Sequence, residues 1–299
     1  MRMILTPIAI FAVALSACGS NSDTSQADLP SVVVTTSIAG DMVTAALGDL
    51  VGSELTVDVI TPVGADAHEF APSAKQAETM ENADLLVVSG LGYEEGMTDL
   101  IANAMDAGAV TFVLGGALEP SEGVDPHVWL DPVLMSEVFA TFPEAVASTT
   151  GVPIADVSAN TSAYVAELVE LDATITAAFA AYPDLQRNLV TSHDALSRFA
   201  DRYGFTIVDT IIPSVSTSAG ASAADLDGVL EAIRTNDVRA IFSETTESDA
   251  LAQAISDEIG RDVPVIELFT ESLGEPGNGA DTYIGMMATN AQLIADALS

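Results

Sequence analysis

Short runs of β-branched and apolar residues recur along this chain of 299 residues, and segments with helical periodicity separate them. Strands are predicted at residues 31–35, 55–60, 84–89 and 109–114 in the first half, and at 188–191, 206–209, 240–243 and 263–267 in the second. Because apolar strands alternate with helices, each half is predicted to form a parallel sheet flanked by helices. Binding sites in such sheets lie at the carboxyl ends of the strands.

One long segment without glycine or proline separates the two halves. From residue 154 to 182 the apolar residues recur at helical spacing, which predicts one helix long enough to span the molecule. The predicted fold class is therefore α/β, with two similar lobes joined by one long rigid helix and a binding site between the lobes. The expected boundaries are 31–150 for the first lobe, 151–184 for the linking helix and 185–299 for the second lobe.

The first residues have the pattern of an export signal. A basic start, an apolar run from Ile4 to Leu15 and the sequence LSAC ending at Cys18 resemble a bacterial lipobox, in which the cysteine carries the lipid. A signal peptide is therefore expected over 1–17 and a lipidated flexible tether over 18–30. Cys18 is the only cysteine, which leaves no thiol for a disulfide or a metal. We expect an exported protein, lipid-anchored to the outer face of the cytoplasmic membrane or in the periplasm.

The composition excludes one large class of partners. The chain has 8 basic and 44 acidic residues, a formal net charge of −36. Such a surface repels phosphate backbones, so no nucleic-acid partner is expected. Dispersed carboxylates attract cations in general but do not select one metal, and the charge is interpreted as a means of solvation.

Only three histidines occur, each in a short segment rich in Gly, Pro or Asp after a predicted strand. The segments are PVGADAHEF with His68, DPHVWLDP with His127 and TSHDA with His193. Any one of them could be an ordinary loop or core residue satisfied by a backbone carbonyl. Taken together they indicate a single site for a transition metal, since neutral imidazole is a common ligand of zinc and similar ions.

These motifs resemble those of the metal-binding solute-binding lipoproteins of bacterial ABC importers for zinc and manganese. The three histidine segments and a fourth, DTYIGMM from Asp281, follow the family's order, so the resemblance covers almost the whole chain. It implies that one side chain from each motif holds the metal: His68 and His127 from the first lobe, His193 and Asp281 from the second. Three imidazoles and one carboxylate would give a closed four- or five-coordinate site.

Four acidic residues are candidates for orienting the imidazoles through the ring nitrogen that does not face the metal. Glu69, Asp66 and Asp194 lie next to or near histidines in the sequence, and Glu244 follows a predicted strand. Turn and capping roles explain the first three about as well, and solvation of the surface explains Glu244.

The resemblance implies a monomer that captures one divalent ion, delivers it to ABC permease subunits and is not an enzyme. The ligand set favours zinc, although residues 114–124 lack the histidine-rich loop common in zinc-specific members, and manganese members often have Glu where this chain has His193. Manganese or iron(II) cargo, or an adhesin-like surface lipoprotein, are the alternatives. A zinc hydrolase is remote, because no His-Glu-x-x-His motif is present.

Overall fold

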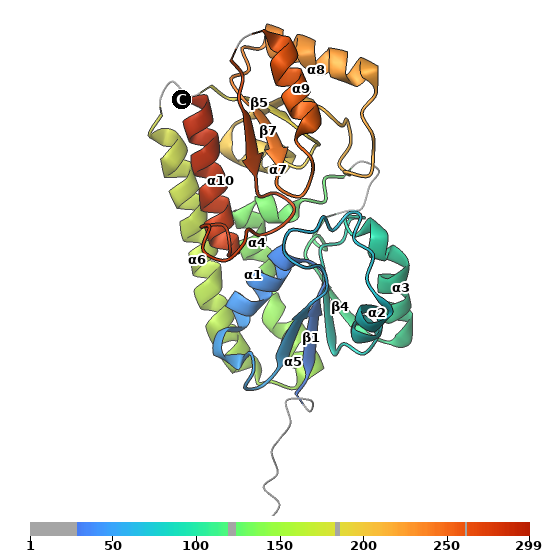
Figure 1. The fold of residues 1–299 in the computed structure, drawn as a ribbon. Helices are drawn as coiled ribbons and strands as arrows, with labels where there is room; N and C mark the ends of the chain where they lie inside the picture. Colours follow the sequence, from blue (N-terminus) through green and yellow to red (C-terminus); the bar gives the residue numbers. More distant parts are fainter. Residues whose placement is uncertain (1–28, 119–123, 183–185, 261) are drawn as a thin grey trace, which may run out of the picture.

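A computed structural model describes residues 29–118, 124–182, 186–260 and 262–299, and Figure 1 shows two lobes stacked along one long helix. The predicted signal peptide, with Cys18 and nearly all of the tether, lies outside the described residues. Within the described ranges, no helix is long and apolar enough to cross a membrane.

The first lobe is built on a parallel sheet with the strand order β2-β1-β3-β4. Its strands are β1 (Ser31–Val34), β2 (Thr56–Val59), β3 (Leu85–Val88) and β4 (Val110–Val113). Its helices are α1 (Ser37–Leu47), α2 (Ala74–Glu81), α3 (Thr98–Ala107), α4 (Pro132–Phe139) and α5 (Phe142–Thr150), with short 3-10 turns at Gly48–Leu50, Glu95–Met97 and Val128–Leu130. β3 is buried along its whole length because helices cover both faces of the sheet.

The second lobe repeats this plan with the strand order β6-β5-β7-β8, again all parallel. Its strands are β5 (Asn188–Thr191), β6 (Thr206–Thr210), β7 (Ile241–Glu244) and β8 (Val265–Leu268). Its helices are α7 (Ser197–Tyr203), α8 (Ala223–Thr235), α9 (Ala250–Ile259) and α10 (Tyr283–Leu298). The carboxyl ends of both sheets meet where the lobes touch, which places loops from both lobes around one point.

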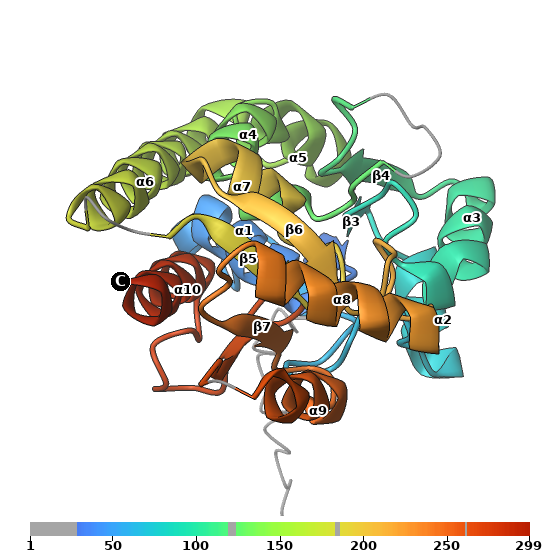
Figure 2. The ribbon, with the colours of Figure 1, turned by 90° about the horizontal axis from the view of Figure 1, so that it is seen from above.

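The linking helix is α6 (Ile154–Ala180), 27 residues or roughly 40 Å long. One face is buried, with side chains from Val157 to Phe179 packed on α1, α4, α5 and α10. Figure 2, seen from above, shows α6 and α10 side by side. One hydrophobic core runs through both lobes, from Val32 on β1 to Leu298 at the end of α10. Two lobes that share a core hold a fixed relation better than two separate domains would.

The predicted fold class is confirmed: two parallel α/β lobes with a long helix between them. Three helices, α2, α4 and α5, lie in segments where no element was predicted. The starts of α2 and α4 are fixed by capping side chains. Ser73 and Gln76 form a capping box at α2. At α4 the Asp131 side chain accepts hydrogen bonds from the backbone amides of Val133 and Leu134, which follow Pro132.

Candidate metal site

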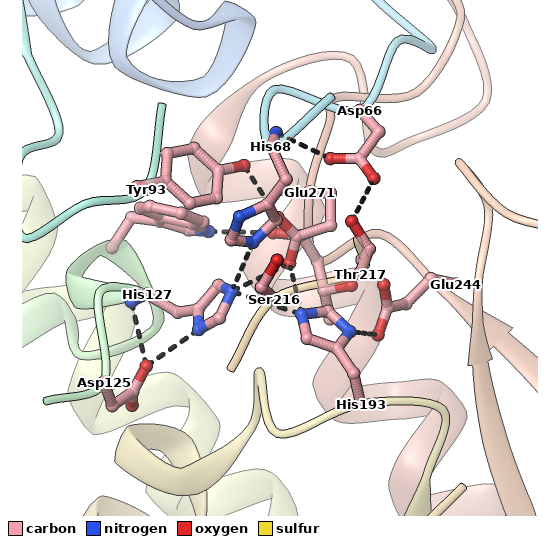
Figure 3. A network of polar contacts seen from close by, with 12 residues as sticks. Asp66, His68, Tyr93, Asp125, His127, His193, Ser216, Thr217, Glu244 and Glu271 are labelled. Carbon is pink, nitrogen blue, oxygen red and sulfur yellow. Dashed lines mark hydrogen bonds and ion pairs between the residues drawn. The ribbon is translucent and has the colours of Figure 1, made fainter. Parts of the chain in front are cut away.

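The three histidines, far apart in the sequence, meet at the interface between the lobes (Figure 3). His68 lies between β2 and α2, His127 between β4 and α4, and His193 directly after β5. Their Nε2 atoms point at one another: His68 Nε2 is 3.4 Å and His193 Nε2 is 3.3 Å from His127 Nε2. All three side chains are buried. The sequence prediction that they gather at one point agrees with this placement.

Short polar turns aim the imidazoles. Asp66 accepts a hydrogen bond from the His68 amide at 2.8 Å, and Asp125 accepts one from the His127 amide at 2.9 Å. In both cases the aspartate lies two residues before the histidine, which is the geometry of an Asx turn. The two first-lobe motifs therefore contain their own device for fixing the backbone of the histidine.

Glu271, three residues beyond the end of β8, is the fourth member of the cluster. Its Oε1 lies 3.4 Å from His127 Nε2 and 3.8 Å from His193 Nε2, and its Oε2 lies 3.8 Å from His68 Nε2. The carboxylate is buried, and Oε2 accepts a hydrogen bond from the Tyr93 hydroxyl at 2.7 Å. Four potential ligand atoms, one from each of four loops, thus surround one point.

The structure does not bring Asp281 to the histidines, and Glu271 takes the position expected for it. Asp281 is exposed, and its Oδ2 accepts a hydrogen bond from the Gly277 amide at 2.9 Å, which organises the loop before α10. Sequence reasoning missed Glu271, although a usable signal was present. Glu271 follows the last predicted strand just as His193 follows an earlier one, so the rule that singled out the histidines applies to it as well.

A carboxylate faces the Nδ1 atom of each imidazole, on the side away from the cluster. The pairs are His68 with Glu95 at 3.5 Å, His127 with Asp125 at 2.7 Å and His193 with Glu244 at 2.6 Å. A carboxylate at Nδ1 favours the tautomer that keeps the proton there and leaves the Nε2 lone pair free for a metal. Glu244 was a candidate for this role; Glu95 and Asp125 were not.

The other three candidates for this role are not in these pairs. Glu69 is exposed, and Asp66 accepts a hydrogen bond from the His68 amide. Asp194 accepts a hydrogen bond from the Ser197 hydroxyl at the start of α7. For Asp66 and Asp194 the turn role is therefore the one the structure shows.

Burial and neighbouring charges move the pKa values of the cluster in different directions. Burial, with the positive fields of the other two histidines, lowers the pKa of His68 to about 3. Burial also acts to lower the pKa of His193, but the Glu244 carboxylate outweighs it and raises that pKa to about 9. Burial raises the pKa of Glu271, and His127 and His193 oppose this. The metal-free cluster thus holds His193 protonated and His68 neutral near neutral pH.

Contacts across the interface enclose the cluster. Trp129 Nε1 donates to the carbonyl oxygen of Thr270 at 2.8 Å, next to Glu271. The Thr217 hydroxyl donates to Asp66 Oδ2 at 2.6 Å and connects the His68 loop to the second lobe (Figure 3). Because each contact joins a loop of one lobe to a loop of the other, the four donors keep their positions only while the lobes stay together.

The spacing of the donors fits a small tetrahedral ion. A tetrahedral ion with bonds of about 2.05 Å to nitrogen separates neighbouring nitrogens by about 3.3 Å. The Nε2 separations of 3.3 Å between His193 and His127 and 3.4 Å between His68 and His127 match this value. Three borderline nitrogen donors and one oxygen donor are a ligand set that suits zinc and its neighbours.

Comparison with known proteins gives a consistent result. A family model described as zinc-uptake complex component A, periplasmic, matches residues 32–297. The manganese-binding lipoprotein MntA of Halalkalibacterium halodurans is 29% identical over 100% of this chain and 100% of that protein. The iron ABC transporter substrate-binding lipoprotein MtsA of Streptococcus pyogenes is 27% identical over 95% of this chain and 94% of that protein. The solved structure of the periplasmic zinc-binding protein TroA from Treponema pallidum superposes with a TM-score of 0.82 at 27% identity, covering 91% of this chain and 99% of that one.

Proposed function

Because this chain belongs to the family of the periplasmic zinc-uptake complex component A, we propose that it captures one divalent transition-metal ion outside the cytoplasm and passes it to an ABC permease. His68, His127 and His193 bind the ion through Nε2, and Glu271 binds it through its carboxylate. The ion is cargo, so it must be bound and released without chemical change. We assign no catalytic role to the site.

The observation that carries this proposal is the convergence of four buried donors from four loops and both lobes. The Nε2 atoms of the three imidazoles face one another, and the buried Oε1 of Glu271 has no hydrogen-bond partner among the described residues. A divalent cation at their centre would satisfy these atoms. Each ligand comes from a separate loop, so parting of the lobes would split the donor set and release the ion.

We favour zinc as the cargo. Neutral imidazole suits zinc, and zinc binds such nitrogen-rich sites more tightly than manganese or iron(II). Manganese is the second candidate, because the relative named for manganese aligns over the full length of this chain. Affinity alone does not separate the two, since the intrinsic order favours zinc even in a manganese carrier. The metal content of protein isolated from its native host would distinguish zinc from manganese as the cargo.

Partners and location follow from the same proposal. The permease subunits of an ABC importer receive the ion, and the related MtsA protein carries that transport role in its name. A lipid on Cys18 holds the monomer at the outer face of the cytoplasmic membrane or in the periplasm. Labelling with a radioactive fatty acid should mark the wild-type protein and not Cys18→Ser; equal labelling of both would reject the anchor.

The proposal is tested by titrating metal-free protein with zinc and counting bound ions by elemental analysis after dialysis. One ion per chain is expected. His68→Ala, His127→Ala and His193→Ala should each weaken binding by about 100-fold or more, since each loses a ligand. Thr235→Ala, an exposed site on α8, serves as the control and should bind as the wild type does. Retention of no ion by the wild type, or unchanged affinity in any histidine variant, contradicts the proposed site.

A further inference from the structure

A small cavity of about 30 Å³ lies behind the His193 ring, on its Nδ1 side. It is formed where β7 ends and α9 begins. Its polar lining consists of Ser192, Ser243, Glu244, Glu247, Ser248 and Asp249. A volume of this size holds one water-sized particle or one ion. The cavity is separate from the point where the three Nε2 atoms meet, because it lies on the opposite edge of the imidazole.

Two buried oxygens in this wall lack a partner. Glu244 is 4% exposed; its Oε1 accepts a hydrogen bond from the Ser192 hydroxyl at 2.8 Å and lies 2.6 Å from His193 Nδ1. Its Oε2 has no hydrogen-bond partner among the described residues, and neither does the buried hydroxyl of Ser243. Figure 3 shows one oxygen of Glu244 at the His193 ring and the other turned away from it. A buried carboxylate oxygen without a partner carries a large desolvation cost.

A second carboxylate lies beside Glu244. A carboxylate oxygen of Glu247 and one of Glu244 lie within 4.8 Å of each other, and Glu247 is half-buried. Within the described ranges, no Lys or Arg forms an ion pair with either residue. Burial and then the nearby Glu244 raise the pKa of Glu247 to about 7, although His193 opposes this shift.

We propose that this cavity is a second cation site, formed by the oxygens of Glu244, Glu247 and Ser243, and that it takes a hard divalent cation such as Mn²⁺, Mg²⁺ or Ca²⁺. Carboxylate and hydroxyl oxygens are the donors such ions prefer, and waters complete their coordination. Glu244 then connects the two sites, with Oε1 at His193 and Oε2 at the second ion. The two sites are filled at the same time. A neutral His193 that binds a metal through Nε2 keeps its proton on Nδ1, which faces Glu244 Oε1, and Glu244 Oε2 remains free for the second ion.

The experiment uses full-length protein loaded with one equivalent of zinc, so that the histidine cluster is filled. Mn²⁺ is then added in salt high enough to screen the acidic surface, and free Mn²⁺ is followed by electron paramagnetic resonance. Zinc content is measured again afterwards, because Mn²⁺ is not expected to displace zinc from imidazoles. One additional Mn²⁺ per chain is expected.

Glu247→Gln keeps the shape of the side chain, and it should weaken the additional Mn²⁺ binding at least about tenfold while leaving one zinc per chain. Glu231→Gln, an exposed carboxylate on α8, is the matched control and should behave as the wild type does. Absence of saturable Mn²⁺ binding, or saturable binding that Glu247→Gln leaves intact, overturns the second site. Failure of zinc binding itself would contradict the histidine site instead, and comparison of Mn²⁺ binding in the wild type and Glu247→Gln would still decide this proposal.

Discussion

At the scale of single residues, the site depends on which nitrogen of each imidazole is free. The three Nε2 atoms face one another, and a carboxylate oxygen lies 2.6 to 3.5 Å from each Nδ1, so Nε2 is the expected ligand atom. The strength of that support differs. Glu244 is buried, whereas Glu95 is 42% exposed and shares its charge with water. The carboxylate beside His193 is therefore less screened by water than the one beside His68.

Glu271→Gln and Asp281→Asn form a matched pair, since each replaces a carboxylate by its isosteric amide. Glu271→Gln should weaken zinc binding at least about 100-fold, because an anionic ligand becomes a neutral one. Asp281→Asn should leave zinc affinity unchanged, because Asp281 is exposed and bonds its own loop. Calorimetric titration of the two variants measures the difference. The reverse ranking would restore Asp281 as the ligand.

The pKa of His193 sets the pH dependence of metal binding. Because the metal-free protein carries a proton on His193 below about pH 9, zinc must displace that proton. Affinity should therefore fall about tenfold for each pH unit below about 9. His68, with a pKa of about 3, adds no competition across this range. The raised pKa of Glu271 steepens the loss at lower pH.

Competition with a chelator from pH 8.5 to 6 measures this slope, and calorimetry in two buffers counts the protons released. About one proton per zinc is expected near pH 7.5. A flat affinity profile would mean that His193 carries no proton to displace or does not bind the metal. Histidines with their ordinary pKa near 6.5 would place this window near pH 6 to 7. Glu244 is the main reason that the structure moves it upward.

Sequence predicts the residues of this site unevenly, for physical reasons. The histidines were accessible because histidine is rare in the chain and each one follows a strand. The carboxylate of Glu271 could not be predicted in this way, because 44 acidic residues make any single one inconspicuous. Asp281 was predicted as a ligand because of the motif around it, but its side chain accepts a hydrogen bond within the loop before α10. The pairing of Glu95 with His68 depends on the backbone turn after β3, which no sequence pattern in this chain specifies.

At the scale of elements, the long helix α6 carries the packing between the lobes. Leu168 is fully buried in the shared core, and its neighbour Val169 is 54% exposed. Leu168→Ala should lower the free energy of unfolding by about 2–5 kcal/mol, since it removes buried methyl groups and leaves a cavity. Val169→Ala should change it by less than about 0.5 kcal/mol. Denaturant unfolding of the metal-free proteins measures both values, and equal effects would contradict the assignment of the buried face.

Helices with a strong apolar pattern could be predicted from the sequence, whereas a helix that depends on capping side chains at its N-terminus could not. α6 shows its apolar stripe over many turns, so its range was predicted closely. α2 buries only Met80, so it has almost no stripe to detect. It forms because the Ser73 and Gln76 side chains satisfy the free amides at its start. Such helices are visible to sequence reasoning only when the cap itself is examined.

At the scale of the whole molecule, the two lobes close over the site through a few polar contacts above a shared core. Asp66 serves two of them: Oδ1 fixes the His68 amide, and Oδ2 accepts from Thr217 of the opposite lobe. This contact joins a ligand loop directly to the other lobe. A change at Thr217 should therefore affect how fast the ion leaves more than how the ligands are arranged.

Thr217→Val removes the hydroxyl at similar volume and costs the bond's contribution, about 0.5–1.5 kcal/mol. Zinc release should become about two- to tenfold faster, because the His68 loop separates more easily from the second lobe. Stopped-flow mixing with excess chelator measures the rate. Ser218→Ala, the exposed neighbour, is the control and should release zinc at the wild-type rate. Equal rates in all three proteins would show that this contact does not hold the site closed.

One ion is expected among His68, His127, His193 and Glu271, between two lobes that share a core. The most direct test is a crystal structure of the zinc-loaded protein with anomalous diffraction recorded at the zinc edge. We expect one strong anomalous peak within about 2.0–2.2 Å of the three Nε2 atoms and of a Glu271 carboxylate oxygen. A peak at Asp281, or none at the point where the three imidazoles meet, would contradict this placement of the ion.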